Sequence, residues 1–172
     1  MQRQTLVSHL RSNRDRVLRA TALPDPAFER TYGIGKWSIR QVLAHLADTE
    51  FIGLWRFCRA VAEPGSTVEA FDEPRWAAAL EYAKRPTRGS IDLFASARAT
   101  VLHYAETLAD DRLARACTHP EKGLMTGWDW LALIPAHADH HVGQIESAAA
   151  GTPWQPRVTA ESWKYGAGVR PM

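Results

Sequence analysis

The chain has 172 residues, of which 45% are hydrophobic and seven are tryptophan, and its 21 basic and 19 acidic side chains leave a net charge of +2. This length and composition are sufficient to bury the core of one domain of ordinary size, so we expect a single domain over residues 1–172. The near balance of charge gives no basis for electrostatic capture of nucleic acid, and it argues against a nucleic-acid-binding function.

Two further features bear on the compartment. The opening residues Met1 to Gln4 lead into a polar segment, and the sequence contains no uninterrupted apolar run of about 18 residues, so we expect neither a signal peptide nor a membrane span. Cys58 and Cys117 are far apart and form no CxxC pattern. This usage favours a reduced, cytoplasmic protein over a disulfide scaffold.

Apolar residues recur at helical spacing in the first third of the chain. The pattern predicts one amphipathic helix over about residues 2–20, ended by Pro24 and Pro26. A second helix is predicted from Ser38, because Ser38 followed three residues later by Gln41 has the spacing of a capping box. We expect that helix to run to about Val61.

The middle of the chain predicts one short and one long helix. Asp72 is placed to cap a short helix with Pro74 in its first turn. Ser90 is the expected cap of a long helix over about residues 90–109. No alternating strand pattern or hairpin turn is evident in the sequence, and residues 110–123 are expected to form a polar connection.

A last long helix is predicted from Thr126, paired with Asp129 three residues on, to about Ala150. Residues 151–172 show no clear periodicity and are expected to form an irregular tail. The complete pattern predicts an all-α four-helix bundle with an extra short helix. The long connections, residues 21–37 and 62–89, are compatible with either an up-and-down order or a crossover.

The last predicted helix carries a histidine pair. His137 and His141 are one helical turn apart, close enough for two imidazoles to bind one metal ion. They share a face with Ile134 and Ile145, which indicates that they point toward the core. Buried histidines require a metal ion, hydrogen-bond partners or a wet cavity, and the residues alone do not choose among these.

The second predicted helix carries two more polar groups. His45 lies beside its apolar stripe, and Glu50 lies within it. A carboxylate in that position is costly unless it is paired. A histidine N–H, a role as general base and a buried ion pair all remain open for Glu50.

Two segments carry a resemblance to a known family: residues 36–50, KWSIRQVLAHLADTE, and residues 137–145, HADHHVGQI. Their content, order and wide separation resemble the DinB/YfiT-like superfamily of metal-dependent helical bundles, where DinB denotes the damage-inducible family and not the polymerase of that name. The resemblance extends through about Ala150. It implies that His45, His137 and His141 form a three-histidine metal site, commonly for zinc or nickel, in a bundle that often forms a homodimer.

The same resemblance suggests a reaction class. Three neutral imidazoles leave a coordination position for water or substrate, and some relatives are thiol-dependent transferases or isomerases that use a low-molecular-weight thiol. One branch, the mycothiol-dependent maleylpyruvate isomerases, has glutamate where this chain has His137, which points away from that branch. We therefore expect a metal-dependent enzyme acting on a small molecule, with a thiol-dependent transferase as one form. The alternative is a non-catalytic metal-binding stress or interaction protein.

Three nearby features complete the predicted site. His140 lies toward the edge of the histidine face, where a supporting or surface role is expected and a role as alternate ligand is open. Gln144 lies on the same face and is expected to be solvated, with donation to a ligand as the other interpretation. No glutamate follows His137, so the HExxH motif of metallopeptidases is absent.

Overall fold

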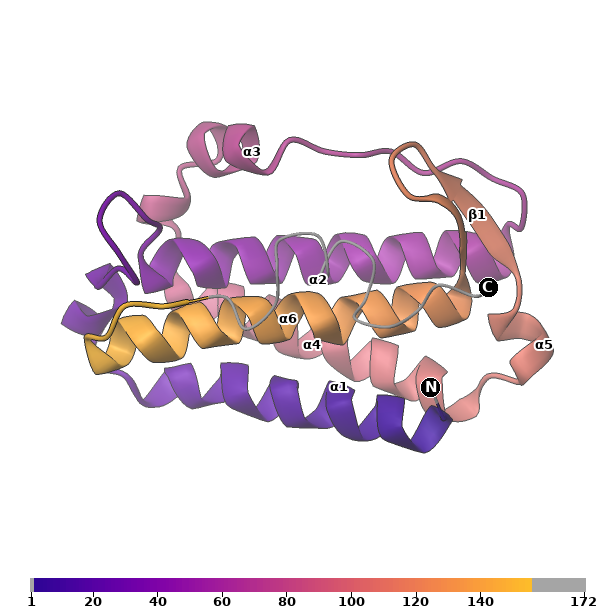
Figure 1. The fold of residues 1–172 in the computed structure, drawn as a ribbon, viewed down its shortest axis with the longest axis horizontal. Helices are drawn as coiled ribbons and strands as arrows, with labels where there is room; N and C mark the ends of the chain where they lie inside the picture. The colour runs from indigo at the N-terminus through magenta and orange to yellow at the C-terminus, as the bar shows by residue number, and fades with distance from the viewer. Residues whose placement is uncertain (1, 156–172) are drawn as a thin grey trace.

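The computed structural model describes residues 2–155 of the chain. Four long helices, α1 (Arg3–Leu18), α2 (Ile39–Ala62), α4 (Thr87–Thr107) and α6 (Gly127–Ala150), form the bundle shown in Figure 1. The remaining elements are the helices α3 (Glu73–Ala79) and α5 (Asp110–Leu113), the strands β1 (Ala116–His119) and β2 (Gly123–Thr126), and 3-10 turns at Arg19–Ala22, Asp25–Glu29 and Tyr82–Lys84. The prediction of an all-α four-helix bundle with an extra short helix is confirmed.

The helices that carry the histidines begin where the capping signals placed them. The Ser38 hydroxyl accepts from the backbone N–H of Gln41, whose side chain accepts from the N–H of Ser38. Thr126 and Asp129 make the same reciprocal pair at the start of α6. Each box satisfies backbone donors that the first helical turn leaves free, which fixes the start of both helices.

Two local predictions are wrong. Helix α4 begins at Thr87 after Pro86, so Ser90 is a buried residue of its first turn rather than its cap. Residues 110–123 are not a plain connection, because they include α5 and most of an antiparallel hairpin in which Cys117 pairs with Met125. The four-residue strands were too short for an alternating pattern to be recognised, and Gly123 at the turn has the positive φ (74°) that glycine tolerates.

The order of helices in the bundle includes a crossover. Helices α1 and α2 each pack against both α4 and α6, so α1 and α2 occupy opposite corners. Residues 63–86 carry the chain back along the bundle, as Figure 1 shows, and α4 therefore runs parallel to α2. As a result α2 and α6 are antiparallel neighbours, which brings the middle of α6 beside the first half of α2.

Apolar side chains fill the bundle in two large groups. One gathers around Phe57 and Trp130, and the other around Ile39 and Phe94. None of the helices in the part of the chain that the structure describes is long and apolar enough to cross a lipid bilayer. An irregular tail was expected over residues 151–172. Residues 151–155 of it are described by the structure, and residues 156–172 lie outside the described part.

Candidate metal centre

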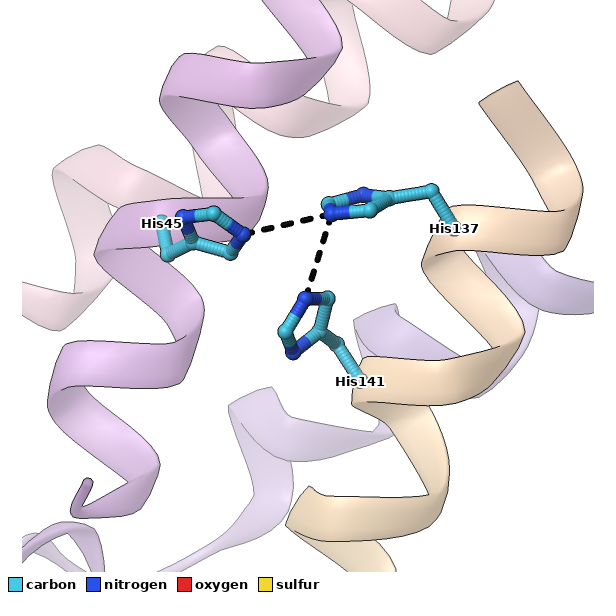
Figure 2. A group of neighbouring side chains, drawn as sticks. All are labelled: His45, His137 and His141. Atoms are coloured by element: carbon cyan, nitrogen blue, oxygen red, sulfur yellow. Dashed lines mark hydrogen bonds between the residues drawn. The ribbon is translucent and has the colours of Figure 1, made fainter. Parts of the chain in front are cut away.

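The three predicted histidines come together between α2 and α6. His45 projects from α2 toward His137 and His141 of α6, as Figure 2 shows. The Nε2 atom of His137 lies 3.2 Å from Nε2 of His45 and 3.1 Å from Nε2 of His141. His45 is fully buried, His141 is 8% exposed and His137 is partly exposed. Among the described residues, these three are the group of histidine, cysteine or acidic side chains whose geometry suits a metal ion.

The spacing of these nitrogens fits a shared ion. Ligand nitrogens about 2.0–2.1 Å from a tetrahedral zinc ion are about 3.3 Å from each other, close to both separations around His137. Three neutral imidazoles carry one N–H each, so the converging nitrogens cannot all be satisfied by mutual hydrogen bonds in any one arrangement of protons. The donor set therefore fits a divalent metal ion better than three hydrogen-bonded core histidines.

Burial keeps all three imidazoles neutral, the form that binds metal. It lowers the pKa of His45 to about 4, a shift that the nearby Asp48 carboxylate opposes. The pKa values of His137 and His141 lie well below the ordinary 6.5, chiefly through burial and also through the neighbouring histidines. Their nitrogens are therefore free of competing protons at neutral pH.

Gln144 holds the ring of His141. Its Oε1 accepts from Nδ1 of His141 at 2.7 Å, which leaves the lone pair of His141 on Nε2, facing the other histidines. Its Nε2 donates to Nε2 of His140 at 3.3 Å. The expectation of a solvated glutamine is wrong: Gln144 is 4% exposed. His140 is half-buried against His141 and Trp154 and lies outside the group of three. Of the supporting and surface roles expected for it, this placement agrees with the supporting one.

Glu50 is committed to an ion pair. Its two carboxylate oxygens accept from Nε and Nη2 of Arg98 on α4, at 2.6 and 2.8 Å, and both side chains are buried. Burial raises the pKa of the Glu50 carboxyl, and the Arg98 guanidinium opposes that rise. Of the interpretations left open, the buried ion pair is therefore the one observed. A bond to a histidine and a role as general base are not supported, because both oxygens are engaged.

A pocket opens beside the histidines. Its volume is about 390 Å³, and His137 belongs both to the histidine group and to its lining. Its walls come from α2, from residues 70–74, from the turn of the hairpin and from the first half of α6. A molecule held there would lie against the open side of His137.

The sequence interpretation missed Arg98 and the pocket residue Arg56. Each is a cation on a helix face that is otherwise apolar, with Phe94 and Val101 flanking Arg98 on α4 and Gly53 and Phe57 flanking Arg56 on α2. A charged residue within an apolar stripe indicates a buried, paired or functional charge. This signal was present at Arg56 and Arg98, but the sequence analysis applied it to Glu50 alone. No local sequence pattern could place His119 and the hairpin turn at the pocket, because it is the crossover of the chain that brings them there.

The two histidine segments suggested a family, and comparison with models of protein families tests that suggestion. The model of the DinB superfamily matches residues 9–145. The chain belongs to the DinB superfamily. Both histidine segments lie within the matched residues, so the three converging imidazoles are part of the family domain.

Curated relatives in this family carry a functional name. A protein of Halalkalibacterium halodurans, named "Putative metal-dependent hydrolase", is 27% identical over 131 residues, which are 76% of each chain. YfiT of Bacillus subtilis, with the same designation, is 26% identical over 133 residues, covering 77% of this chain and 75% of YfiT.

Solved structures agree on the fold. The structure of YfiT from Bacillus subtilis, described as having an unusual four-helix bundle topology, matches with a TM-score of 0.79 and 24% identity over 90% of this chain and 89% of that one. A mycothiol-dependent maleylpyruvate isomerase matches with a TM-score of 0.68 and 12% identity, over 84% of this chain and 61% of the isomerase. At these identities both likenesses show the shared bundle alone.

Proposed function

We propose that this DinB-superfamily protein is a metal-dependent hydrolase of a small molecule, with one divalent ion held by His45, His137 and His141. The observation that carries the proposal is the convergence of three neutral imidazoles, one of which, His137, lines a pocket, with two nitrogen separations that suit one ion. The name shared by the curated relatives supports hydrolysis as the reaction. Zinc and nickel are the ions that we expect.

The ion would supply Lewis acidity and a nucleophile deprotonated at neutral pH, which is the chemistry of a three-histidine site with an open position. The protein's own groups would do the rest. Gln144 orients His141, and burial keeps the ligand imidazoles unprotonated. The apolar walls beside His137 would hold the substrate and exclude bulk water.

The proposed enzyme could be a hydrolase or a thiol-dependent transferase, and the two differ in the nucleophile. Water gives a hydrolase, and a low-molecular-weight thiol gives the thiol-dependent transferase expected from the sequence. In the part of the chain that the structure describes, no carboxylate joins the three histidines as a fourth ligand. This favours a catalytic site over a purely structural one. The non-catalytic alternative predicts metal binding without turnover of any substrate class. A homodimer remains part of the proposal.

Metal content of single variants tests the shared site. His45→Ala, His137→Ala and His141→Ala should each reduce bound metal to below about a tenth of the wild-type amount, because each removes one of three protein ligands. The measurement is elemental analysis of protein purified without a histidine tag, with circular dichroism to verify the fold. His140→Ala and the exposed His103→Ala should retain metal. Stoichiometric metal in His45→Ala would exclude the shared site.

Turnover tests the reaction class. The metal-loaded protein should hydrolyse members of a panel of chromogenic esters, amides and phosphoesters, and the activity should be lost in all three variants. The same panel with added bacterial thiols identifies the transferase form. Stoichiometric metal binding without turnover in either panel would contradict the enzymatic proposal and favour the non-catalytic alternative.

A further inference from the structure

Helix α6 ends in a turn that folds the next residues back onto it. Gly151 has the positive φ (69°) that commonly ends a helix, and the backbone N–H of Thr152 donates to the carbonyl of Ser147 at 2.9 Å. Pro153 follows and cannot continue the helix. The chain therefore returns along α6, as Figure 1 shows, and the side chain of Trp154 lies against the second half of that helix.

Trp154 is also held by the loop that precedes α2. Its backbone N–H donates to the carbonyl of Tyr32 at 3.3 Å. Its indole meets the Tyr32 ring edge to face, with the ring centroids 5.8 Å apart, which is a favoured arrangement of two aromatic rings. The partly buried Trp154 side chain is therefore fixed between two separate parts of the chain.

A glycine on α6 makes room for this indole. Gly143 lies inside the helix, where alanine is intrinsically more favourable than glycine. A Cβ atom at residue 143 would lie 2.8 Å from Nε1 of Trp154, so the indole would have to move. Gly89 in α4 provides a contrast, because a Cβ atom there would meet no atom within 4 Å. Close packing against Trp154 is thus a physical reason for glycine at residue 143.

Trp154 is connected to the histidine group through His140. The His140 ring meets the Trp154 ring edge to face at 4.7 Å between centroids, and it meets His141 in the same way at 4.9 Å. Nε2 of His140 accepts from the side-chain nitrogen of Gln144, whose oxygen accepts from Nδ1 of His141. An amide can present either its oxygen or its nitrogen to a neighbour, and only the oxygen leaves the lone pair of His141 on Nε2. The acceptor on His140 selects that orientation.

We propose that Trp154 is a positioning residue of the metal site. It holds the His140 ring, which fixes the orientation of the Gln144 amide and thereby the metal-binding tautomer of His141. The proposal rests on the proposed function, because it concerns the same three-histidine site. Trp154 acts through other side chains, so its loss should weaken metal binding without abolishing it.

Zinc affinity of the full-length protein, purified without a histidine tag, tests this role by competition with a chromogenic chelator. Trp154→Leu should lower the affinity about fivefold, less than the loss of a direct partner of a ligand histidine. Gly143→Ala should have a similar effect by displacing the indole, although alanine favours the helix. Gly89→Ala and Trp55→Leu are the matched controls, since residue 89 has open space and Trp55 is 45% exposed, and both should bind like the wild type.

A double variant tests the path of contacts. Trp154→Leu should have no further effect on zinc affinity in a Gln144→Leu background, because both changes interrupt the same connection to His141. An equal loss in the two backgrounds would overturn the proposal, and so would wild-type affinity in both Trp154→Leu and Gly143→Ala. If Trp154→Leu loses its helical circular dichroism, Gly143→Ala takes its place in both measurements.

The metal-free protein gives a readout that needs no zinc. In ¹⁵N–¹H spectra the side-chain amide signals of Gln144, assigned with Gln144→Leu, should move toward those of solvated glutamines in Trp154→Leu and Gly143→Ala. They should stay in place in Gly89→Ala. Unchanged Gln144 signals in both test variants would overturn the proposal, whether or not the protein binds metal. Wild-type protein that binds no zinc would instead contradict the proposed function, so the two failures are distinct.

Discussion

At the scale of single residues, Gln144 links the histidine group to the rest of α6. Its side-chain oxygen fixes which nitrogen of His141 carries the proton, and its nitrogen engages His140. A ligand imidazole with the wrong tautomer or a free ring orientation binds metal poorly. Gln144 is therefore a positioning residue for His141, and its effect should appear in metal affinity rather than in folding.

Replacement of Gln144 tests that role. Gln144→Leu removes the acceptor for Nδ1 of His141 and should lower zinc affinity about 10-fold to 100-fold, the range found for partners of ligand histidines. Competition with a chromogenic chelator measures the affinity. Gln144→Glu is the control, because its carboxylate can also accept from Nδ1 and should preserve tight binding. Unchanged affinity in Gln144→Leu would remove Gln144 from the site.

At the scale of elements, one buried polar network connects all four long helices. Arg98 of α4 pairs with Glu50 of α2 and donates to the Leu10 carbonyl and to the Asn13 side chain of α1. Asn13 in turn donates to the carbonyl of Pro135 in α6 at 3.0 Å. The network lies beside the pocket through Glu50, so it fixes the relative positions of the helices that carry the histidines.

Removal of one partner of this network should be costly. Arg98→Met leaves the Glu50 carboxylate buried and unpaired, and it should lower the free energy of unfolding by about 3–5 kcal/mol. Denaturant unfolding of the metal-free protein measures the change. The double variant Glu50→Leu/Arg98→Met should recover most of the loss, because it removes both buried charges. A double variant as unstable as the single one would show that packing of Arg98, rather than its charge, is responsible.

At the scale of the whole molecule, burial of neutral histidines makes folding sensitive to acid. Burial lowers the pKa of His45 and of His119 to about 4, and it holds His137 and His141 well below 6.5. In the unfolded chain these groups titrate near 6.5. Between about pH 6.5 and pH 4 the unfolded chain therefore binds more protons than the folded one, so stability falls as the pH falls.

The unfolding free energy of the metal-free protein should accordingly decrease from pH 7.5 to pH 5. Each buried histidine contributes a slope of at most about 1.4 kcal/mol per pH unit below its unfolded pKa. Urea unfolding at a series of pH values measures the slope. His119→Gln removes one such group outside the histidine cluster. It should reduce the slope by at most about 1.4 kcal/mol per pH unit, which is the contribution of one proton. A flat profile from pH 7.5 to pH 5 would contradict the burial of these rings as neutral groups.

The sequence by itself determined the features that depend on neighbouring residues. The capping boxes at Ser38 and Thr126 placed the starts of α2 and α6, because both halves of each box lie three residues apart. Helical spacing predicted the long helices, and the one-turn interval between His137 and His141 predicted that both rings share a face. The addition of His45 came from the family resemblance, since no local spacing relates it to a pair 92 residues later.

The tertiary structure decided whatever depends on which helices are neighbours. The crossover makes α2 and α6 antiparallel neighbours, which brings His45 to His137, and it places Arg98 rather than a histidine against Glu50. It also carries the hairpin turn and residues 70–74 to the pocket where Arg56 is held. Long connections fix no register between helices, so packing of the apolar faces and pairing of buried charges select these contacts, and neither is visible in a local pattern.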